Sequence, residues 1–140
     1  MHILTTRFNI KTLQENVEWK KKKKITTCAY GLSKKLPETI STGSYVYVIE
    51  MINDKENISL GKNKKNKYKK GMIAGIGYLK NRYFPHNRSR IYDDQNYNRY
   101  VYIGDKYISR EDIIKKMGDN IINFLEKILF TGTRHYKRGR

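Results

Sequence analysis

The sequence predicts a single α+β domain: a curved, mainly antiparallel sheet of five or six strands, or a small β-barrel, with a short N-terminal helix and a long C-terminal helix. Three observations predict this class. Ser44–Ile52 is dense in β-branched and aromatic residues, Gly71–Arg82 contains an apolar run with no charge before Lys80, and Ser109–Phe130 repeats apolar residues at helical spacing. A chain of 140 residues can bury one sizeable core. We therefore assign residues 1–130 to the domain and residues 131–140 to a basic C-terminal tail.

The N-terminal part of the chain predicts a strand, a helix and a second strand. Ile3–Asn9 begins with an apolar-polar alternation, which is typical of an edge strand. Thr12 and Glu15 have the spacing of a capping box, so we expect a helix from about Leu13 to Lys20. Ile25–Tyr30 contains β-forming residues and is expected to be a short strand that ends before a glycine.

The middle of the chain predicts two long strands separated by a lysine-rich loop. A loop with one helical turn at Pro37–Ile40 leads into the strand Ser44–Ile52. Gly61–Lys70 contains six lysines and no aliphatic residue, so we expect an exposed loop. In the next strand Gly75 and Gly77 remove two side chains from one face. They indicate either a bulge or bend, or a strip where a helix, another backbone or a planar ligand approaches closely.

The C-terminal part predicts a surface connection, a hairpin and the long helix. Arg82–Arg90 contains a proline and three arginines and is expected on the surface. Asn98–Ile108 has two β-type runs separated by Gly104-Asp105, which favours a hairpin. Ser109 is the expected N-cap of the helix, and Gly118 marks a kink inside it.

Charge is the strongest global property of the chain. Its 30 lysines and arginines exceed its 13 aspartates and glutamates, which gives a net charge of +17. Such an excess attracts polyanions and points to nucleic acid as the partner. Two alternatives are an AT-rich genome that favours lysine codons, and a basic structural component of a virion or ribonucleoprotein particle. No apolar stretch is long enough to span a membrane, no secretion signal is present, and Cys28 is the only cysteine, so a cytoplasmic protein is expected.

The candidate binding residues are basic side chains near aromatic ones, the composition that clamps phosphates and stacks bases. Trp19 precedes five consecutive lysines and is either a stacking residue or a core residue beside a solvated face. The basic residues expected to contact phosphate are Lys20, Lys21, Lys22, Lys23, Lys24, Lys62, Lys64, Lys65, Lys67, Lys69, Lys70, Arg82, Arg88, Arg90, Arg134, Lys137, Arg138 and Arg140.

The sequence offers few catalytic parts. It has no Gly-Lys-Ser or Gly-Lys-Thr phosphate loop, and its histidines have no metal-ligand spacing. Asp93 and Asp94, with Glu50 elsewhere, are typical of a turn rather than a cation site. We therefore expect no catalytic residues, no metal and no cofactor. The predicted function is non-catalytic binding of nucleic acid, RNA or single-stranded DNA, without a membrane.

One resemblance suggests an enzyme instead. The segment TGSYVYVIEMINDKENISLGKN, Thr42–Asn63, is similar in rhythm to a GIY-YIG nuclease, with an aromatic strand, a turn and a second strand that ends in glycine. The second strand, Ile58–Gly61, departs from that pattern because it lacks a tyrosine. No amphipathic helix follows it to present a catalytic arginine. A nuclease is therefore the alternative function.

A second resemblance covers most of the chain. Ile91–Arg110, with IAGIGYLKN before it and FLEKILFTGTRHYKRGR after it, resembles a group of uncharacterised proteins encoded by large cytoplasmic DNA viruses. The region of Trp19, the strand Tyr45–Met51 and the closing Lys137–Gly139 belong to the same resemblance. It implies a viral protein of the host cytoplasm or the virion and brings no activity. Gly61–Lys70 looks like an insertion in that pattern.

A third resemblance concerns architecture. The strands YVYVIEM and MIAGIGYLKN, with short flanking helices and a later hairpin, are similar to the small β-barrels of the PUA-like class, which includes EVE, ASCH and YTH domains. This resemblance implies an aromatic-lined pocket that receives a base of RNA or DNA. The aromatic residues expected to form or flank that pocket are Trp19, Tyr30, Tyr45 and Tyr78.

Overall fold

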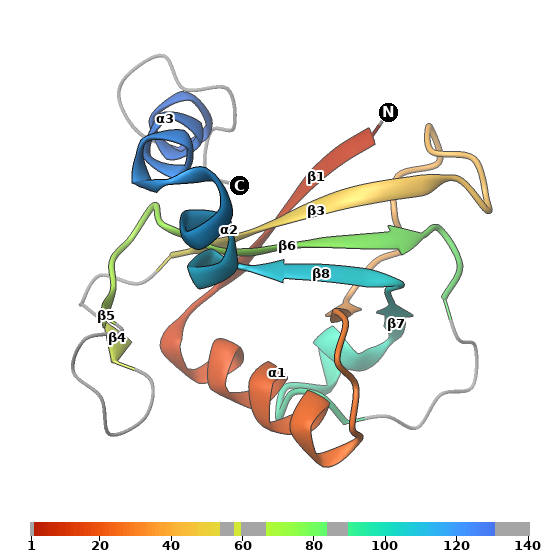
Figure 1. The fold of residues 1–140 in the computed structure, drawn as a ribbon. Helices are drawn as coiled ribbons and strands as arrows, with labels where there is room; N and C mark the ends of the chain where they lie inside the picture. Colours follow the sequence, from red (N-terminus) through yellow and green to blue (C-terminus); the bar gives the residue numbers. More distant parts are fainter. Residues whose placement is uncertain (1, 54–57, 60–66, 84–89, 131–140) are drawn as a thin grey trace. The chain divides into compact units, whose positions relative to one another are not determined.

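The computed structural model describes residues 2–53, 58–59, 67–83 and 90–130 (Figure 1). In chain order its elements are β1 His2–Phe8, α1 Ile10–Lys22, β2 Ala29–Leu32, β3 Tyr45–Ile52, β4 Ile58–Ser59, β5 Lys67–Tyr68, β6 Ile73–Lys80, the 3-10 helix η1 Gln95–Asn98, β7 Tyr100–Ile103, β8 Lys106–Ser109, α2 Arg110–Met117 and α3 Asp119–Leu129. The predicted α+β class is confirmed.

The described strands form three sheets rather than one. A mixed four-stranded sheet has the order β1-β3-β6-β8, and β2-β7 and β4-β5 form two-stranded sheets. The expectation of one sheet with five or six strands was therefore wrong. The described strands form no closed barrel. The basic tail, residues 131–140, and residues 61–66 of the lysine-rich loop lie outside the described residues. The expected loop also contains the short strand β5, Lys67–Tyr68.

Residue contacts divide the chain into two compact units. The first unit comprises Met1–Leu4, Lys11–Val48 and Gly77–Tyr107, and the second comprises Thr5–Ile10, Ile49–Ile76 and Ile108–Arg140. The strands β1, β3, β6 and β8 each contribute residues to both units. The candidate site described below belongs entirely to the first unit.

In the first unit, β2 and β7 supply much of the core. They pair antiparallel with Tyr30 opposite Tyr102, and both tyrosines are buried. A Cβ atom at Gly77 on β6 would collide with the Tyr30 hydroxyl and with Cys28, whose Sγ would lie 2.7 Å away. The face of β6 at Gly77 is therefore covered by the side chains of Tyr30, in β2, and Cys28, the residue before β2. It is neither an open ligand surface nor a helix contact.

The predicted hairpin at Gly104-Asp105 was wrong. β7 pairs with β2, whereas β8 lies beside β6 in the four-stranded sheet. The Gly104 N–H donates to the Cys28 carbonyl at 2.8 Å, and the Asp105 N–H donates to the Tyr78 carbonyl at 2.9 Å. These two residues therefore carry the chain from one sheet to the other. Only glycine fits at 104, because a Cβ atom would meet Cys28 and the Tyr78 carbonyl.

In the second unit, helices α2 and α3 pack on the sheet residues through an isoleucine core. Ile49, Ile73, Ile113 and Ile122 are buried together. The single long helix that the sequence predicted is broken at Gly118, whose φ of +86° ends α2 and precedes α3. The predicted N-cap is confirmed, since the Ser109 hydroxyl accepts the Asp112 N–H at 3.1 Å.

Other element predictions were confirmed with shifted ends. The strands expected around Ile3–Asn9, Ser44–Ile52 and Gly71–Arg82 are β1, β3 and β6, and the Ile40 N–H donates to the Pro37 carbonyl in the expected turn. Helix α1 begins at Ile10, so Thr12 lies inside it and the expected capping box does not mark its start. The second expected strand starts later, at Ala29, and continues through the glycine that was expected to end it.

Candidate nucleic-acid interface

Three tyrosines form a continuous row on the open face of β3 and β6. Along β3, Tyr45 and Tyr47 are 43% and 39% exposed, while Val46 is buried on the opposite face. Tyr78 of β6 lies between them, with ring-centroid distances of 4.8 Å to each. Its ring is inclined by 3° to that of Tyr45 and by 47° to that of Tyr47. We call Tyr45, Tyr47 and Tyr78 the tyrosine row.

Strand register explains why these rings meet. The Gly43 N–H donates to the Asn81 carbonyl at 3.0 Å, and the Asn81 N–H donates to the Ser44 carbonyl at 2.7 Å. In this antiparallel arrangement alternate residues of β3 and β6 share a face. Lys80 follows the row on β6, and its ammonium lies 5.5 Å from the centre of the Tyr45 ring. The face thus combines exposed rings with a cation, as stacking platforms for unpaired bases do.

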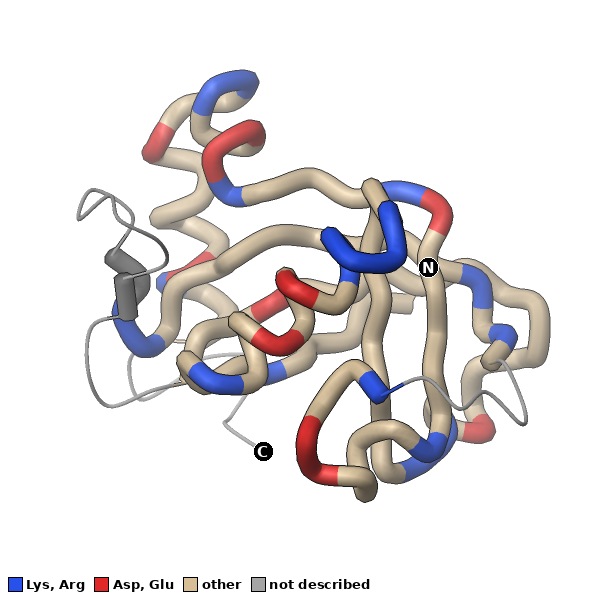
Figure 2. Tube along the Cα trace, turned by 90° about the horizontal axis from the view of Figure 1, so that it is seen from below, with Lys and Arg blue, Asp and Glu red and all other residues tan. Residues whose placement is uncertain are grey.

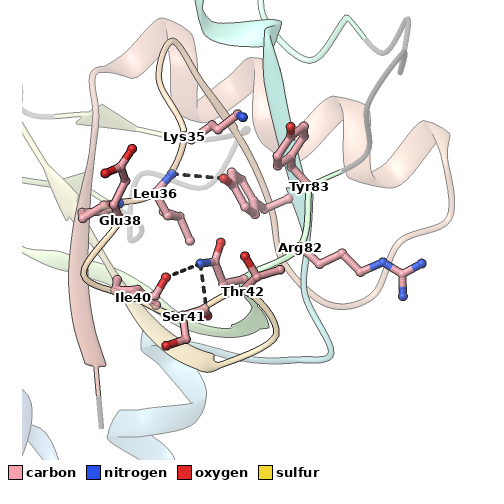
Figure 3. A pocket seen from close by; sticks show the side chains of 11 residues that line it. Lys35, Leu36, Glu38, Ile40, Ser41, Thr42, Arg82 and Tyr83 are labelled. Carbon is pink, nitrogen blue, oxygen red and sulfur yellow. Dashed lines mark hydrogen bonds between the residues drawn. The ribbon is translucent and has the colours of Figure 1, made fainter.

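The structure contains a pocket of about 550 Å³ (Figure 3). Several of its lining residues lie shortly before β3 or directly after β6 in the sequence. Its lining includes Lys35, Ile40, Ser41, Asn81, Tyr83 and Tyr102. The volume is within the range of small-molecule sites, roughly 300–1,000 Å³. Figure 3 shows the Lys35 and Tyr83 side chains on one side of the pocket and Ile40 and Ser41 on the other, while the Arg82 side chain extends away from it.

Hydrogen bonds fix two walls of this pocket. The Asn81 side-chain amide donates to the carbonyls of Ile40 at 2.9 Å and Ser41 at 3.3 Å. The buried Tyr102 hydroxyl accepts the Leu36 N–H at 3.1 Å. These bonds attach the loop before β3 to Asn81, directly after β6, and to Tyr102 of β7, so the pocket has a preformed shape.

Aromatic rings and one ammonium form another side of the pocket. The Tyr83 ring packs edge-to-face against Tyr100 and Tyr102, with centroid distances of 5.2 and 6.0 Å. The Lys35 ammonium lies 5.2 Å from the Tyr83 ring centre and 5.9 Å from that of Tyr100. A hydrogen bond with Tyr83 raises the pKa of Lys35 above its ordinary value. Lys35 therefore carries a positive charge at the pocket at neutral pH.

Two phenols of the site are held in the neutral form. Loss of hydration raises the pKa of Tyr78, and the neighbouring Tyr47 and Tyr45 add to the shift. Burial also raises the pKa of Tyr102, an effect that the Leu36 N–H bond opposes only in part. Both hydroxyls consequently remain possible hydrogen-bond donors at neutral pH.

Alkaline titration of the folded protein is expected to show a late tyrosine component. A raised folded-state pKa means that the neutral phenol contributes stability below the unfolded value of about 10, and that this contribution is lost as pH rises through the folded pKa. Tyrosinate absorbance should therefore develop at higher pH for Tyr78 and Tyr102 than in the protein unfolded by denaturant. Tyr78→Phe and Tyr102→Phe should each remove part of the late component. Coincident folded and unfolded curves would contradict this expectation.

The four aromatic residues expected at a pocket divide into two pairs. Tyr45 and Tyr78 stack in the tyrosine row. Trp19 and Tyr30 are only 8% and 3% exposed and belong to the core. A base cannot stack on them in the folded chain, so their assignment to the binding surface is corrected. None of the four lines the 550 Å³ pocket, whose aromatic walls are Tyr83 and Tyr102 instead.

The lysine run at the end of α1 is one continuous basic stretch of the chain, coloured blue in Figure 2. Lys21, Lys22, Lys23 and Lys24 are exposed. Lys20 is half-buried, because its ammonium donates to the Thr27 carbonyl at 3.2 Å and lies 4.3 Å from the Tyr107 ring centre. Lys20 thus has a structural role, and the four following lysines remain available to an anion.

The other predicted basic residues fall into two groups. Those with an exposed side chain are Lys69, Lys70, Arg82 and Arg90. Those that lie outside the described residues, or whose side chains do, are Lys62, Lys64, Lys65, Lys67, Arg88, Arg134, Lys137, Arg138 and Arg140.

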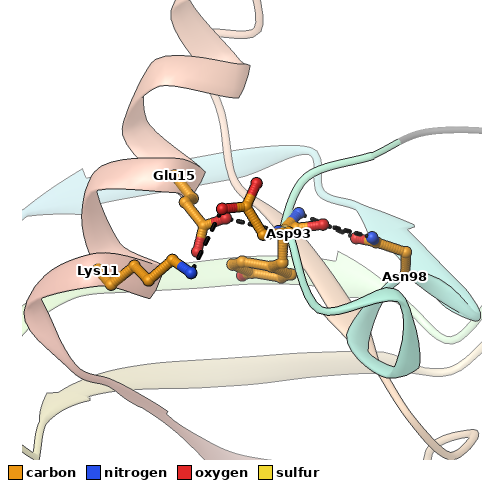
Figure 4. A network of polar contacts seen from close by, with 5 residues as sticks. Lys11, Glu15, Asp93 and Asn98 are labelled. Atoms are coloured by element: carbon orange, nitrogen blue, oxygen red, sulfur yellow. Dashed lines mark hydrogen bonds and ion pairs between the residues drawn. The ribbon is translucent and has the colours of Figure 1, made fainter.

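The acidic residues considered for a cation have structural partners (Figure 4). Asp93 forms an ion pair with Lys11 at 3.3 Å, and its N–H donates to Glu15 at 2.6 Å. Asp94 caps η1 by accepting the Asn96 N–H at 3.0 Å. These contacts confirm the predicted turn. Among the described residues, no group of three or more histidine, cysteine, aspartate or glutamate side chains is placed to hold a metal ion.

Comparison with known proteins gives no relative for this chain. No protein-family model, curated protein or solved structure matches it. Within the described residues, no helix combines the length and apolar composition that a membrane crossing requires.

Proposed function

We propose that this protein binds single-stranded nucleic acid, RNA or DNA, without catalysis. The observation that carries the proposal is the tyrosine row, in which Tyr45 stacks on Tyr78 while Tyr45 and Tyr47 stay exposed beside the Lys80 ammonium. Rings exposed on a strand face attract the flat surfaces of bases, and a nearby cation attracts the phosphate that follows each base.

The charge of the chain supports the same partner. A net charge of +17 favours association with any polyanion. The exposed lysines at the end of α1, together with Lys35 and Lys80, supply cations to the unit that holds the tyrosine row. Phosphate contacts of this kind give affinity without sequence preference.

The rings favour a single strand over a duplex. In a duplex the bases stack on each other and expose only their edges in the grooves. The faces of unpaired bases are free to stack on aromatic side chains. Exposed tyrosine rings on a sheet face therefore suit a single strand, and this arrangement does not require a closed barrel.

The nuclease alternative has less support. In the resemblance, the segment that begins at Ile58 is the second strand of a motif whose first strand is β3. In the structure β4, Ile58–Ser59, pairs with β5, and the neighbours of β3 are β1 and β6. Tyr45 and Tyr47 of β3 form part of an aromatic cluster.

Affinity for a single-stranded oligonucleotide is expected to fall steeply as salt increases. Each phosphate that the protein neutralises should add about 0.7 to the slope of log affinity against log salt. Lys80→Gln should lower that slope by about this amount. Lys11→Gln is the matched control, because the Lys11 ammonium is already paired with Asp93. Fluorescence anisotropy across a salt series measures both slopes, and an affinity that is independent of salt would refute the proposal.

A further inference from the structure

We propose that the 550 Å³ pocket holds one unstacked base of the bound strand and recognises it through an N–H group on its pairing edge. This inference rests on the proposed function and assigns a task to a second site of the first unit. Four features of the pocket support the inference: its position, its aromatic walls, one fixed hydrogen-bond acceptor and one cation.

The position of the pocket connects it to the tyrosine row. Asn81 lines the pocket and directly follows Lys80, the last residue of β6. Thr42 also lines the pocket and lies shortly before β3. The backbone bonds that join Asn81 to Gly43 and Ser44 hold the two segments together where β3 begins and β6 ends. The pocket and the tyrosine row therefore lie at the same end of β6, and both belong to the first unit.

The walls of the pocket suit a planar, partly apolar group. Tyr83 and Tyr102 contribute rings, and Ile40 and Leu36 contribute aliphatic surface. Single-stranded recognition commonly places an unstacked base against such walls and reads its pairing edge by hydrogen bonds.

Asn81 supplies a fixed hydrogen-bond acceptor. Its side-chain nitrogen donates to two carbonyls, those of Ile40 and Ser41. These bonds determine which end of the amide is oxygen. Among the described residues, no group donates a hydrogen bond to the Asn81 side-chain oxygen. A base that enters the pocket can satisfy this oxygen by donating an N–H, such as the N3–H of uracil or an exocyclic amino group.

Lys35 supplies the charge for the attached phosphate. Its exposed ammonium lies over the Tyr83 and Tyr100 rings at one side of the pocket. A phosphate at this side would gain a charge-assisted hydrogen bond. The same pocket thus offers an aromatic wall, an acceptor for the base edge and a cation for the backbone.

The test compares a short uridine oligonucleotide with one in which every uracil carries a methyl group on N3. The methyl group removes the N–H and leaves the ring faces and phosphates in place. Wild-type protein should bind the methylated strand roughly 2- to 12-fold more weakly, the value of one hydrogen bond. Tyr83→Leu should reduce this discrimination, whereas Tyr97→Leu, at an exposed tyrosine outside the pocket, should preserve it.

The outcomes separate this inference from the proposed function. Equal or tighter binding of the methylated strand, with uridine binding intact, would overturn the pocket assignment and leave the tyrosine row as the binding surface. Failure to bind either strand would refute the proposed function itself. Tyr45→Ala should weaken binding of both strands and keep their ratio, because stacking on the row does not involve N3.

Discussion

Replacing Glu126 by alanine is expected to lower the free energy of unfolding by about 3–5 kcal/mol. Glu126 of α3 forms an ion pair with Arg110 of α2, and both side chains are only 12% exposed. The same Arg110 nitrogen donates to the Ile73 carbonyl of β6 at 2.9 Å. Among the described residues, removing the carboxylate leaves the nearly buried guanidinium with the Ile73 carbonyl as its one acceptor. The cost of that desolvated charge dominates the destabilisation. Chemical denaturation monitored by circular dichroism measures the change.

Two further variants identify the cause of that destabilisation. The double variant Arg110→Met/Glu126→Leu removes both charges and should recover much of the stability, since a buried pair can often be replaced by apolar side chains. Glu18→Ala removes an exposed carboxylate from α1 and should change stability by no more than about 0.5 kcal/mol. A decrease below about 1 kcal/mol for Glu126→Ala would mean that water screens the pair.

The sequence predicted the elements of this fold better than their pairing. The strands β3 and β6 were predicted because runs of β-branched and aromatic residues indicate both a local preference for strand conformation and burial. The hairpin at Gly104-Asp105 failed because a turn signal does not specify which sheet the next strand joins. That choice depends on the fit of Gly104 against Cys28 and the Tyr78 carbonyl, contacts between segments that lie far apart in the sequence.

The C-terminal helix shows a similar limit. Its apolar spacing continues across Gly118, so periodicity alone predicts one helix. The glycine adopts a φ of +86° and lets α2 and α3 meet at an angle that buries Ile113 and Ile122 in one core. The glycine was visible in the sequence, but whether it kinks or ends a helix depends on what the two halves pack against.

The candidate site was predictable only where its residues lie on one regular element. Alternation along β3 makes Tyr45 and Tyr47 neighbours on one face. Trp19 was ambiguous, because an aromatic residue beside lysines fits both a binding surface and a helix face that packs on the core. The pocket joins Lys35, Asn81 and Tyr102 from three separate segments, and no spacing within any single segment indicates that they meet.

Replacing both exposed tyrosines of β3 by alanine is expected to weaken single-strand binding by about 2–6 kcal/mol, which is two stacking contacts of about 1–3 kcal/mol each. Tyr45 and Tyr47 are the exposed members of the tyrosine row, and Tyr78 alone would remain of it. The charges of the chain are unchanged in this variant. The slope of log affinity against log salt should therefore stay close to the wild-type value while the affinity itself falls.

Tyr45→Phe/Tyr47→Phe is the matched control, because phenylalanine keeps the ring face and loses only the hydroxyl. Its affinity should remain within a few-fold of wild type if stacking is the interaction that matters. A second control, Tyr97→Ala, removes an exposed tyrosine from η1 and should leave affinity unchanged. If the double alanine variant folds and binds as tightly as wild type, the row does not contact the strand. In that case the association would rest on the lysines alone, and a duplex should then bind at least as tightly as a single strand, since its phosphates are more densely spaced.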